Sequence, residues 1–348
     1  MTDRGGAFHP VIELTLARLR EFLREPEALF WVVFFPVLLA FALGLAFSRS
    51  GEPEVHVGLV PGPGDARVRE ALLSAPGLVV HDLSREAADR ALRDGEVALV
   101  VRPGSPPGYR FDAAREESRL ARLAVDAALQ RAAGREDRFE PRIERVEIPG
   151  SRYVDWVIPG LLGMNIMGTG MWALGYAVVY ARSRRLLKRL AATPMSRAHY
   201  LAAQMLARLV FLGLEVGALL LFARFVLDVP IAGSLVLVAA VSLLGALSFA
   251  GLGMLVASRA RTIEAVSGWM NFTMVPMWVL SGVFFSSAHF PNVTQPLINA
   301  LPLTALIDAL RAVMLDGAGF GGVAGEAAIL AAWTVGCFAL ALRLFRWQ

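Results

Sequence analysis

The chain has 348 residues, of which 56% are hydrophobic, a formal net charge of +4 and a mean hydropathy of +0.54. This apolar fraction exceeds that of an ordinary soluble domain, so a membrane protein is predicted. Cys337 has no second cysteine to pair with, and Lys188, the only lysine, stands outside any Gly-Lys-Ser/Thr sequence, which excludes a Walker A nucleotide site in this chain.

Residues 1–28 are predicted to form a cytoplasmic helix at the membrane interface. From Val11 to Glu25 the apolar residues share one helical face and the charged residues the other, and Pro26 ends the pattern. Residues 29–47 follow as an uncharged run of about 28 Å, long enough for a first transmembrane helix. The long preceding segment is not net positive, so we expect an uncleaved span rather than a signal peptide.

Residues 48–152 differ in character, because arginines and carboxylates alternate with prolines and no apolar run can span a bilayer. Two β-branched runs that end in Pro-Gly or Arg-Pro-Gly predict strands, and three segments with helical periodicity predict helices. The sequence therefore predicts an α/β domain inserted after the first span. The strands are expected at Val55–Val60 and Val97–Val101, and the helices at Arg67–Leu73, Arg85–Arg93 and Ala113–Arg131.

Residues 153–348 are predicted to form a domain of five further spans. Its apolar runs are Trp156–Ala181, Leu201–Ala223, Val229–Ser258, Ala265–Ala288 and Val323–Leu342. The fold class is thus an α-helical polytopic membrane protein with six transmembrane helices. Residues 286–307 are interrupted by three prolines, which favours re-entrant or interfacial short helices over a seventh span.

Positive charge sets the predicted orientation. Most basic residues of the short segments lie before the first span, between residues 182 and 197, at Arg259 and Arg261, and after the last span, whereas the opposite side has Arg224 and Arg311. Arginine-rich and lysine-rich short loops stay in the cytoplasm. We therefore expect a multi-pass protein of the cell (cytoplasmic or inner) membrane, with both termini cytoplasmic and the α/β domain extracytoplasmic.

A basic amphipathic segment covers residues 183–197, between the second and third spans. On a helix its basic side chains share one arc and its leucines the opposite arc, and Pro194 stops the helix. One interpretation is contact with anionic lipid headgroups. The other is docking of a partner protein, for which the residues are Arg184, Arg185, Leu186, Leu187, Lys188, Arg189, Leu190, Thr193 and Pro194.

Four segments, in order and with compatible spacing, resemble the permease subunits of type-two ABC exporters. They are the opening helix before Phe35-Pro36, the segment Lys188–Arg197, the run Leu280–Phe285, and Pro302–Arg311. The large extracytoplasmic domain expected after the first span resembles the branch of that family that exports drugs, antibiotics or lipids. The resemblance covers nearly the whole chain. It departs from the family at the approach to the second segment, where basic residues stand in place of acidic ones.

The resemblance implies that two permease chains pair, as a homodimer or a heterodimer, and that each contacts a separate ATP-binding subunit. ATP and magnesium would bind that subunit, and this chain would bind no cofactor. Residues 183–197 would be the coupling helix, and the opening helix would be a connecting helix with Arg18, Arg20, Phe22 and Arg24 as its contact residues. Membrane lipid and an envelope adaptor are further expected partners, and nucleic acid is not.

Polar residues inside the predicted spans are the candidates for a substrate path: Asn165, Glu215 and Asn271. A carboxylate at mid-span is costly unless it is paired or hydrated. Glu215 therefore marks either a functional group, in the export path or at a proton-sensitive hinge, or a structural partner of Arg208 or of another helix. Asparagines inside spans are more often partners in interhelical hydrogen bonds than substrate ligands, which is the alternative for Asn165 and Asn271. Scattered histidines and the lack of hydrolase motifs predict neither a metal site nor a catalytic residue.

Two other functions remain open from the residues alone. The chain could be an ion-coupled or proton-coupled secondary transporter, although no inverted repeat is evident. It could also be a membrane receptor or scaffold whose extracytoplasmic domain senses a ligand, although five further spans exceed what anchoring requires.

Overall fold

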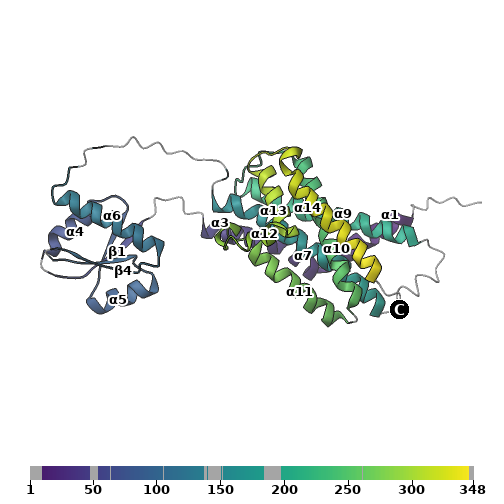
Figure 1. Cartoon of the computed structure of the whole chain (residues 1–348), viewed down its shortest axis with the longest axis horizontal. Coiled ribbons are helices and arrows are strands. Elements are labelled where there is room, and N and C mark those ends of the chain that lie inside the picture. Colours follow the sequence, from purple (N-terminus) through teal and green to yellow (C-terminus); the bar gives the residue numbers. More distant parts are fainter. Residues whose placement is uncertain are drawn as a thin grey trace, which may run out of the picture. The chain divides into compact units, whose positions relative to one another are not determined.

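A computed structural model describes residues 10–47, 54–62, 64–104, 106–136, 139, 150, 152–183, 197–260 and 262–344 (Figure 1). The chain divides into two compact units. The helical unit contains residues 1–48 and 147–348, and the α/β unit contains residues 49–146.

The helical unit begins with α1 (Pro10–Arg24), α2 (Pro26–Leu29), the π-helical turn η1 (Phe30–Phe34) and α3 (Phe35–Ala46). Its long helices are α7 (Tyr153–Ser183), α9 (Arg197–Phe225), α10 (Leu235–Arg259), α11 (Ile263–Leu280) and α14 (Ala324–Leu344). Between α11 and α14 lie the short elements η2 (Ser287–His289), α12 (Gln295–Asn299), α13 (Pro302–Met314) and η3 (Phe320–Val323).

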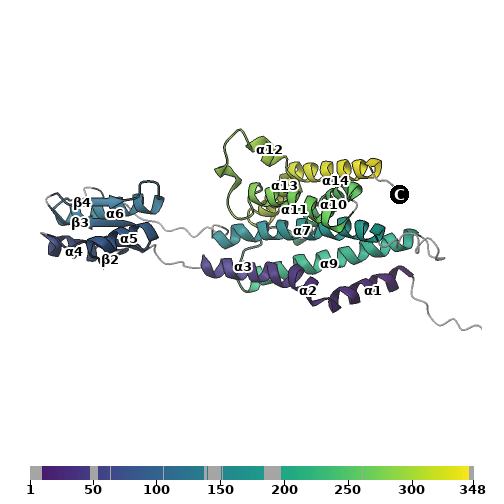
Figure 2. The ribbon, with the colours of Figure 1, turned by 90° about the horizontal axis from the view of Figure 1, so that it is seen from below.

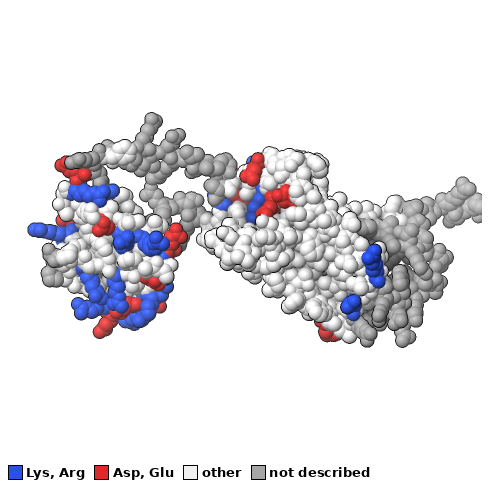
Figure 3. Space-filling model, in the orientation of Figure 1, with Lys and Arg blue, Asp and Glu red and all other residues white. Residues whose placement is uncertain are grey.

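Three helical segments of the described residues are long and apolar enough to cross a membrane: 206–225, 235–259 and 320–344. The shorter segment 30–46 is also apolar. The surface agrees with this composition, because the visible face of the helical unit is broadly uncharged, whereas charges of both signs cover the α/β unit (Figure 3).

The fifth predicted span differs from the structure at its end. The uncharged run Ala265–Ala288 was expected to be one helix, but α11 stops at Leu280. Gly282 follows with a φ of +75°, a left-handed conformation that breaks an α-helix. Residues 286–307 then form short helices rather than one long helix.

Small residues bring α10 against α7 at the centre of the helical unit. A Cβ atom added to Gly253 of α10 would collide with the backbone carbonyl oxygen of Met171 on α7, and one added to Gly170 would lie 2.9 Å from Cβ of Phe249. Two helix backbones can approach this closely only where a side chain is missing. The glycines of the second predicted span therefore serve helix packing.

Helix α13 is the most deeply buried short helix of this unit. It packs against α7, α10 and α14, and Leu303, Leu306 and Leu310 are fully buried. In Figure 2, α13 lies with α10 and α14 on one side of α7, and α9 lies between α7 and α1. The helical unit thus has two groups of helices around α7.

The α/β unit is built on a four-stranded sheet in the order β2-β1-β3-β4. The strands are β1 (Val55–Leu59), β2 (Leu78–Asp82), β3 (Leu99–Arg102) and β4 (Gly108–Phe111). β1 is parallel to β2 and β3, and β4 is antiparallel to β3. The helices are α4 (Asp65–Leu73), α5 (Arg85–Asp94) and α6 (Glu116–Ala132).

The two faces of the sheet have separate cores. On one face, Leu72 of α4 and Val125 of α6 pack with Val57 and Leu59. On the opposite face, Ala88 of α5 packs with Val100. Alternation along β1 explains this division, because successive side chains point to opposite faces. The predicted helix at Ala113–Arg131 begins three residues late, since Asp112 accepts a hydrogen bond from the Ala114 N–H and forms a turn first.

Candidate functional site: a buried polar cluster and the helix ends around it

The residues proposed for partner docking cannot be placed, because Arg184, Arg185, Leu186, Leu187, Lys188, Arg189, Leu190, Thr193 and Pro194 all lie outside the described residues. The predicted connecting helix is described as α1. Its arginines Arg18, Arg20 and Arg24 are exposed, and Arg18 Nη1 lies 2.8 Å from Glu21 Oε2. The exposed arginines leave α1 with a charged surface that a partner or a headgroup can reach.

Helix α1 rests on α9 through its other side. Phe22 contacts Phe211 of α9 with ring centroids 4.4 Å apart, and Thr15 is buried. Ile12, Leu16 and Leu23 remain exposed, so the apolar face predicted from the sequence is only partly covered by protein. An amphipathic helix with this residual apolar surface suits the membrane interface.

A buried polar cluster joins α7 to α9. Arg208 donates from Nη1 to Glu215 Oε1 over 2.8 Å, although the two residues are two turns apart on α9. Arg208 Nη2 donates to Thr169 Oγ1 of α7, also over 2.8 Å. The side chain of Glu215 is 1% exposed and that of Arg208 is 22% exposed. Opposite charges in contact offset much of the cost of burial, so the cluster is tolerated inside an apolar helix layer.

Thr169 is the centre of this cluster. Its hydroxyl accepts from Arg208 and has one proton, which it donates either to Glu215 Oε2 at 2.9 Å or to the backbone oxygen of Asn165 at 2.9 Å. The hydroxyl can therefore exchange partners without leaving a buried charge unpaired. Thr169 is not among the residues predicted from the sequence, because a threonine in an apolar run gives no signal of its own.

Asn165 links the first span to α7, one turn before Thr169. Its Nδ2 donates to the Val32 carbonyl oxygen over 3.2 Å, and only 8% of the residue is exposed. Pro36 explains this contact, since it has no N–H to donate to the carbonyl four residues before it. The chain adapts by a π-helical turn over Phe30–Phe34, and the Asn165 amide supplies a donor to the carbonyl.

Asn271 does not join the cluster. It lies on α11 and is exposed, whereas Asn165 and Glu215 are buried. The Thr169 hydroxyl contacts the carboxylate of Glu215 and the backbone oxygen of Asn165, one turn earlier on α7. The structure therefore brings together two of the three residues proposed for a substrate path.

A charged clamp lies where the chain re-enters the helical unit. Arg152 donates to both carboxylate oxygens of Asp155, over 3.1 and 2.7 Å, and to the backbone oxygen of Asp228 over 2.8 Å. Arg224 of α9 donates to the Asp228 carboxylate over 2.6 Å, and Asp228 has a φ of +52°. These contacts tie the start of α7 to the loop after α9.

Arg311 of α13 fastens a second junction. Its guanidinium lies 3.7 Å from the ring centroid of Trp156 and donates to the Gly282 carbonyl oxygen over 2.6 Å. The nearest nitrogen–oxygen distance to Asp308, three residues earlier on the same helix, is 3.7 Å, so this ion pair is loose. The backbone and ring contacts of Arg311, which spacing could not indicate, hold α13 to the start of α7 and the end of α11.

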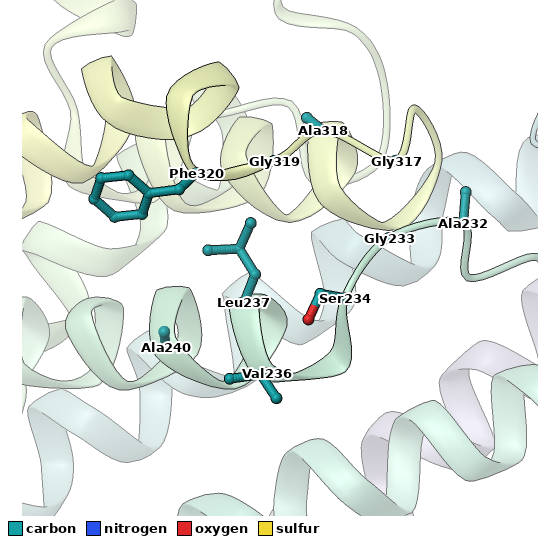
Figure 4. A pocket seen from close by; sticks show the side chains of 10 residues that line it. All are labelled: Ala232, Gly233, Ser234, Val236, Leu237, Ala240, Gly317, Ala318, Gly319 and Phe320. Carbon is teal, nitrogen blue, oxygen red and sulfur yellow. The ribbon is translucent and has the colours of Figure 1, made fainter.

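A shallow groove of about 540 Å³ has two walls (Figure 4). One wall is formed by the α9–α10 loop and the start of α10, and the other by the segment before α14. The Leu237 side chain extends from α10 toward the segment that contains Gly319 and Phe320. Of the described residues that line it, Ser234 alone has a polar side chain. The groove accordingly offers apolar contact and no charged ligand.

The helical unit thus has the architecture of a polytopic helical membrane protein. Its apolar helices enclose an arginine and a glutamate that form an ion pair. The family model described as "ABC-2 type transporter" matches residues 125–315, more than half of the chain. The chain belongs to the ABC-2 type transporter family, a family of membrane permeases. The resemblance to type-two ABC permeases found in the sequence is confirmed.

Curated relatives agree with this family. The chain is 23% identical to the probable multidrug ABC transporter permease YbhS of Escherichia coli K12 over 339 residues, covering 87% of this chain and 88% of the relative. It is 27% identical to the inner membrane transport permease YadH of the same organism, covering 47% of this chain and 64% of the relative. It is 26% identical to the linearmycin resistance permease protein LnrN of Bacillus subtilis, covering 52% and 46%.

Proposed function

We propose that the chain is the membrane permease subunit of an ATP-driven exporter that moves a lipophilic or amphipathic compound out of the cytoplasm or the inner leaflet. The observation that carries this proposal is the family membership together with a relative, similar over nearly the whole chain, that is named a probable multidrug permease. The name of the LnrN relative supports an antibiotic-like substrate class.

ATP and magnesium bind a separate ABC ATP-binding subunit in this proposal. The family implies such a partner, and the chain itself has no Gly-Lys-Ser/Thr sequence. Two permease chains pair, and both termini, α1 and residues 183–197 face the cytoplasm. The α/β unit is extracytoplasmic, where an envelope adaptor can reach it. Positive charge in the short loops supports this orientation.

Residues 183–197 are proposed as the docking helix for the ATP-binding subunit. The Leu186→Asp/Leu190→Asp double variant should lose co-purification of the partner ABC ATP-binding subunit. The reason is that a carboxylate on the apolar arc cannot enter an apolar groove. The matched control is Leu120→Asp/Leu123→Asp, which alters two exposed leucines of the α/β unit. Unchanged co-purification in the first double variant refutes docking through this face.

Transport separates the proposal from its alternatives. Everted membrane vesicles that contain both subunits should accumulate a fluorescent lipophilic dye on addition of ATP and magnesium. The Leu186→Asp/Leu190→Asp variant should abolish this accumulation. Accumulation that persists without ATP and stops when a protonophore is added would instead identify a secondary transporter.

A further inference from the structure

Two histidines of the α/β unit lie side by side on neighbouring strands. His56 Nδ1 of β1 and His81 Nε2 of β2 are 2.9 Å apart, and the ring planes are inclined by 28°, with centroids 5.2 Å apart. In the parallel register, His81 pairs with Gly58, two residues after His56. His56 and His81 therefore lie on the same face of the sheet as a diagonal pair across the two strands.

This pair is open to solvent. Val57 and Leu59 point into the core under α4 and α6, so His56 and Gly58 face the side of α5. α5 packs on β1 and β3, and β2 is an edge strand of the sheet. His56 is exposed and His81 is half-buried. Small ions can therefore reach the ring nitrogens without any movement of the backbone.

We propose that His56 and His81 bind a divalent transition metal ion. Imidazole nitrogens lie about 2.0–2.1 Å from such an ion, and ligand angles between a right angle and the tetrahedral angle then place two nitrogens about 2.9–3.4 Å apart. The observed separation of 2.9 Å falls within this range. The pair is held close to the spacing that two ligands of one ion require.

The proton balance of binding is simple. In the free pair, one neutral ring donates its N–H to the other. On binding, the donor ring takes up a proton at its other nitrogen and gives the first one to water, so both facing nitrogens present lone pairs to the ion. No net proton is released and no oxidant or reductant takes part.

The ligand chemistry selects the ion. Imidazole suits copper, nickel and zinc, whereas magnesium and calcium require oxygen ligands, and affinities rise toward Cu²⁺ in the Irving–Williams order. Among the described residues no group of three or more His, Cys, Asp or Glu side chains gathers. Water therefore fills the remaining positions, and the site exchanges its ion readily. A bound ion ties β1 to the edge strand β2 and stabilises the folded unit by mass action.

The test uses the full-length protein in detergent with any affinity tag removed. Copper(II) chloride is titrated in, binding is followed by calorimetry, and the copper is examined by electron paramagnetic resonance. One equivalent of copper should bind the wild type with superhyperfine coupling from two nitrogens. His56→Gln and His81→Gln should each weaken binding at least tenfold, and zinc, but not magnesium, should compete.

The control is His289→Gln, which removes a histidine of the helical unit whose ring hydrogen-bonds to the Ser286 carbonyl oxygen. This variant should bind copper as the wild type does. Chemical modification of the wild type by diethylpyrocarbonate, read by mass spectrometry, provides a test without variants, because zinc should protect both His56 and His81. Equal copper affinity in the glutamine variants, or no protection by zinc, overturns the proposal.

Discussion

Replacing Arg208 by methionine should destabilise the helical unit more than replacing Glu215 by glutamine. Methionine leaves the Glu215 carboxylate buried, with the Thr169 hydroxyl as the remaining donor described in the structure. Glutamine leaves Arg208, whose side chain is 22% exposed and long enough to move its charge toward a polar region. The asymmetry in burial therefore predicts an asymmetry in cost.

The magnitudes follow from this difference. Removing one partner of a buried ion pair typically costs about 3–5 kcal/mol, which we expect for Arg208→Met. For Glu215→Gln we expect about 1–3 kcal/mol, the cost of a buried polar group that loses a partner. The double variant Arg208→Met/Glu215→Leu removes both charges and should cost less than Arg208→Met alone.

The free energy of unfolding can be measured by titrating the purified protein from a mild detergent into sodium dodecyl sulfate and following helix content by circular dichroism. The matched control is Asn271→Ala, which removes an exposed polar side chain of the same unit and should change the free energy little. A double variant that is as unstable as Arg208→Met would refute the argument, since no uncompensated charge remains in it. Unchanged export and unchanged pH dependence in Glu215→Gln would also remove Glu215 from the export path.

Three further predictions follow from single contacts. Asn165→Ala should lower the free energy of unfolding by about 1–3 kcal/mol. This cost should shrink in a Pro36→Ala background, where the new N–H at residue 36 can donate to the Val32 carbonyl oxygen, and equal costs in both backgrounds would contradict the link between Pro36 and the Asn165 hydrogen bond. Gly253→Ala should lower the free energy of unfolding by about 1–3 kcal/mol because its methyl group meets the backbone of α7, whereas Gly213→Ala, with nothing within 4 Å, should not lower it. Equal shifts in melting temperature for the two variants would rule out the close packing of α10 on α7. Burial, and then the neighbouring Asp126 carboxylate, raises the pKa of Tyr109 from 10.0 to about 12, so its neutral form stabilises the α/β unit at pH 9 and this contribution is lost as pH rises through 12. The difference in melting temperature between wild type and Tyr109→Phe should therefore shrink between pH 9 and pH 11.5, and a constant difference would contradict the shift.

The regular elements were largely predictable, because they depend on periodicities that can be read along the chain. The β-branched runs became β1 and β3, and the helical patterns of the α/β unit became α4, α5 and α6. β2 and β4 were not predicted. Leu78–Asp82 ends in His-Asp and Gly108–Phe111 has one apolar side, so neither shows the pattern of a buried strand, and both are defined by pairing with strands distant in sequence.

The candidate site was less predictable. Arg208 and Glu215 stood out because charge is rare in an apolar run, but the sequence left open whether they pair. In the structure they pair directly, and both also contact Thr169, which a different helix contributes. Asn271 looked equivalent to Asn165 in sequence and is not equivalent in space, because only Asn165 faces a carbonyl that a proline leaves without its usual helical donor.

The sequence by itself determined the class of this protein: long uncharged runs must lie in an apolar medium, a charged segment without such runs cannot, and four ordered segments identify the permease family. Tertiary structure alone decided which polar groups meet. Hydrogen bonds and ion pairs act over about 3 Å and between residues as distant as Val32 and Asn165, so their partners depend on how the helices pack. The residue pattern along one helix does not predict which other helices it packs against.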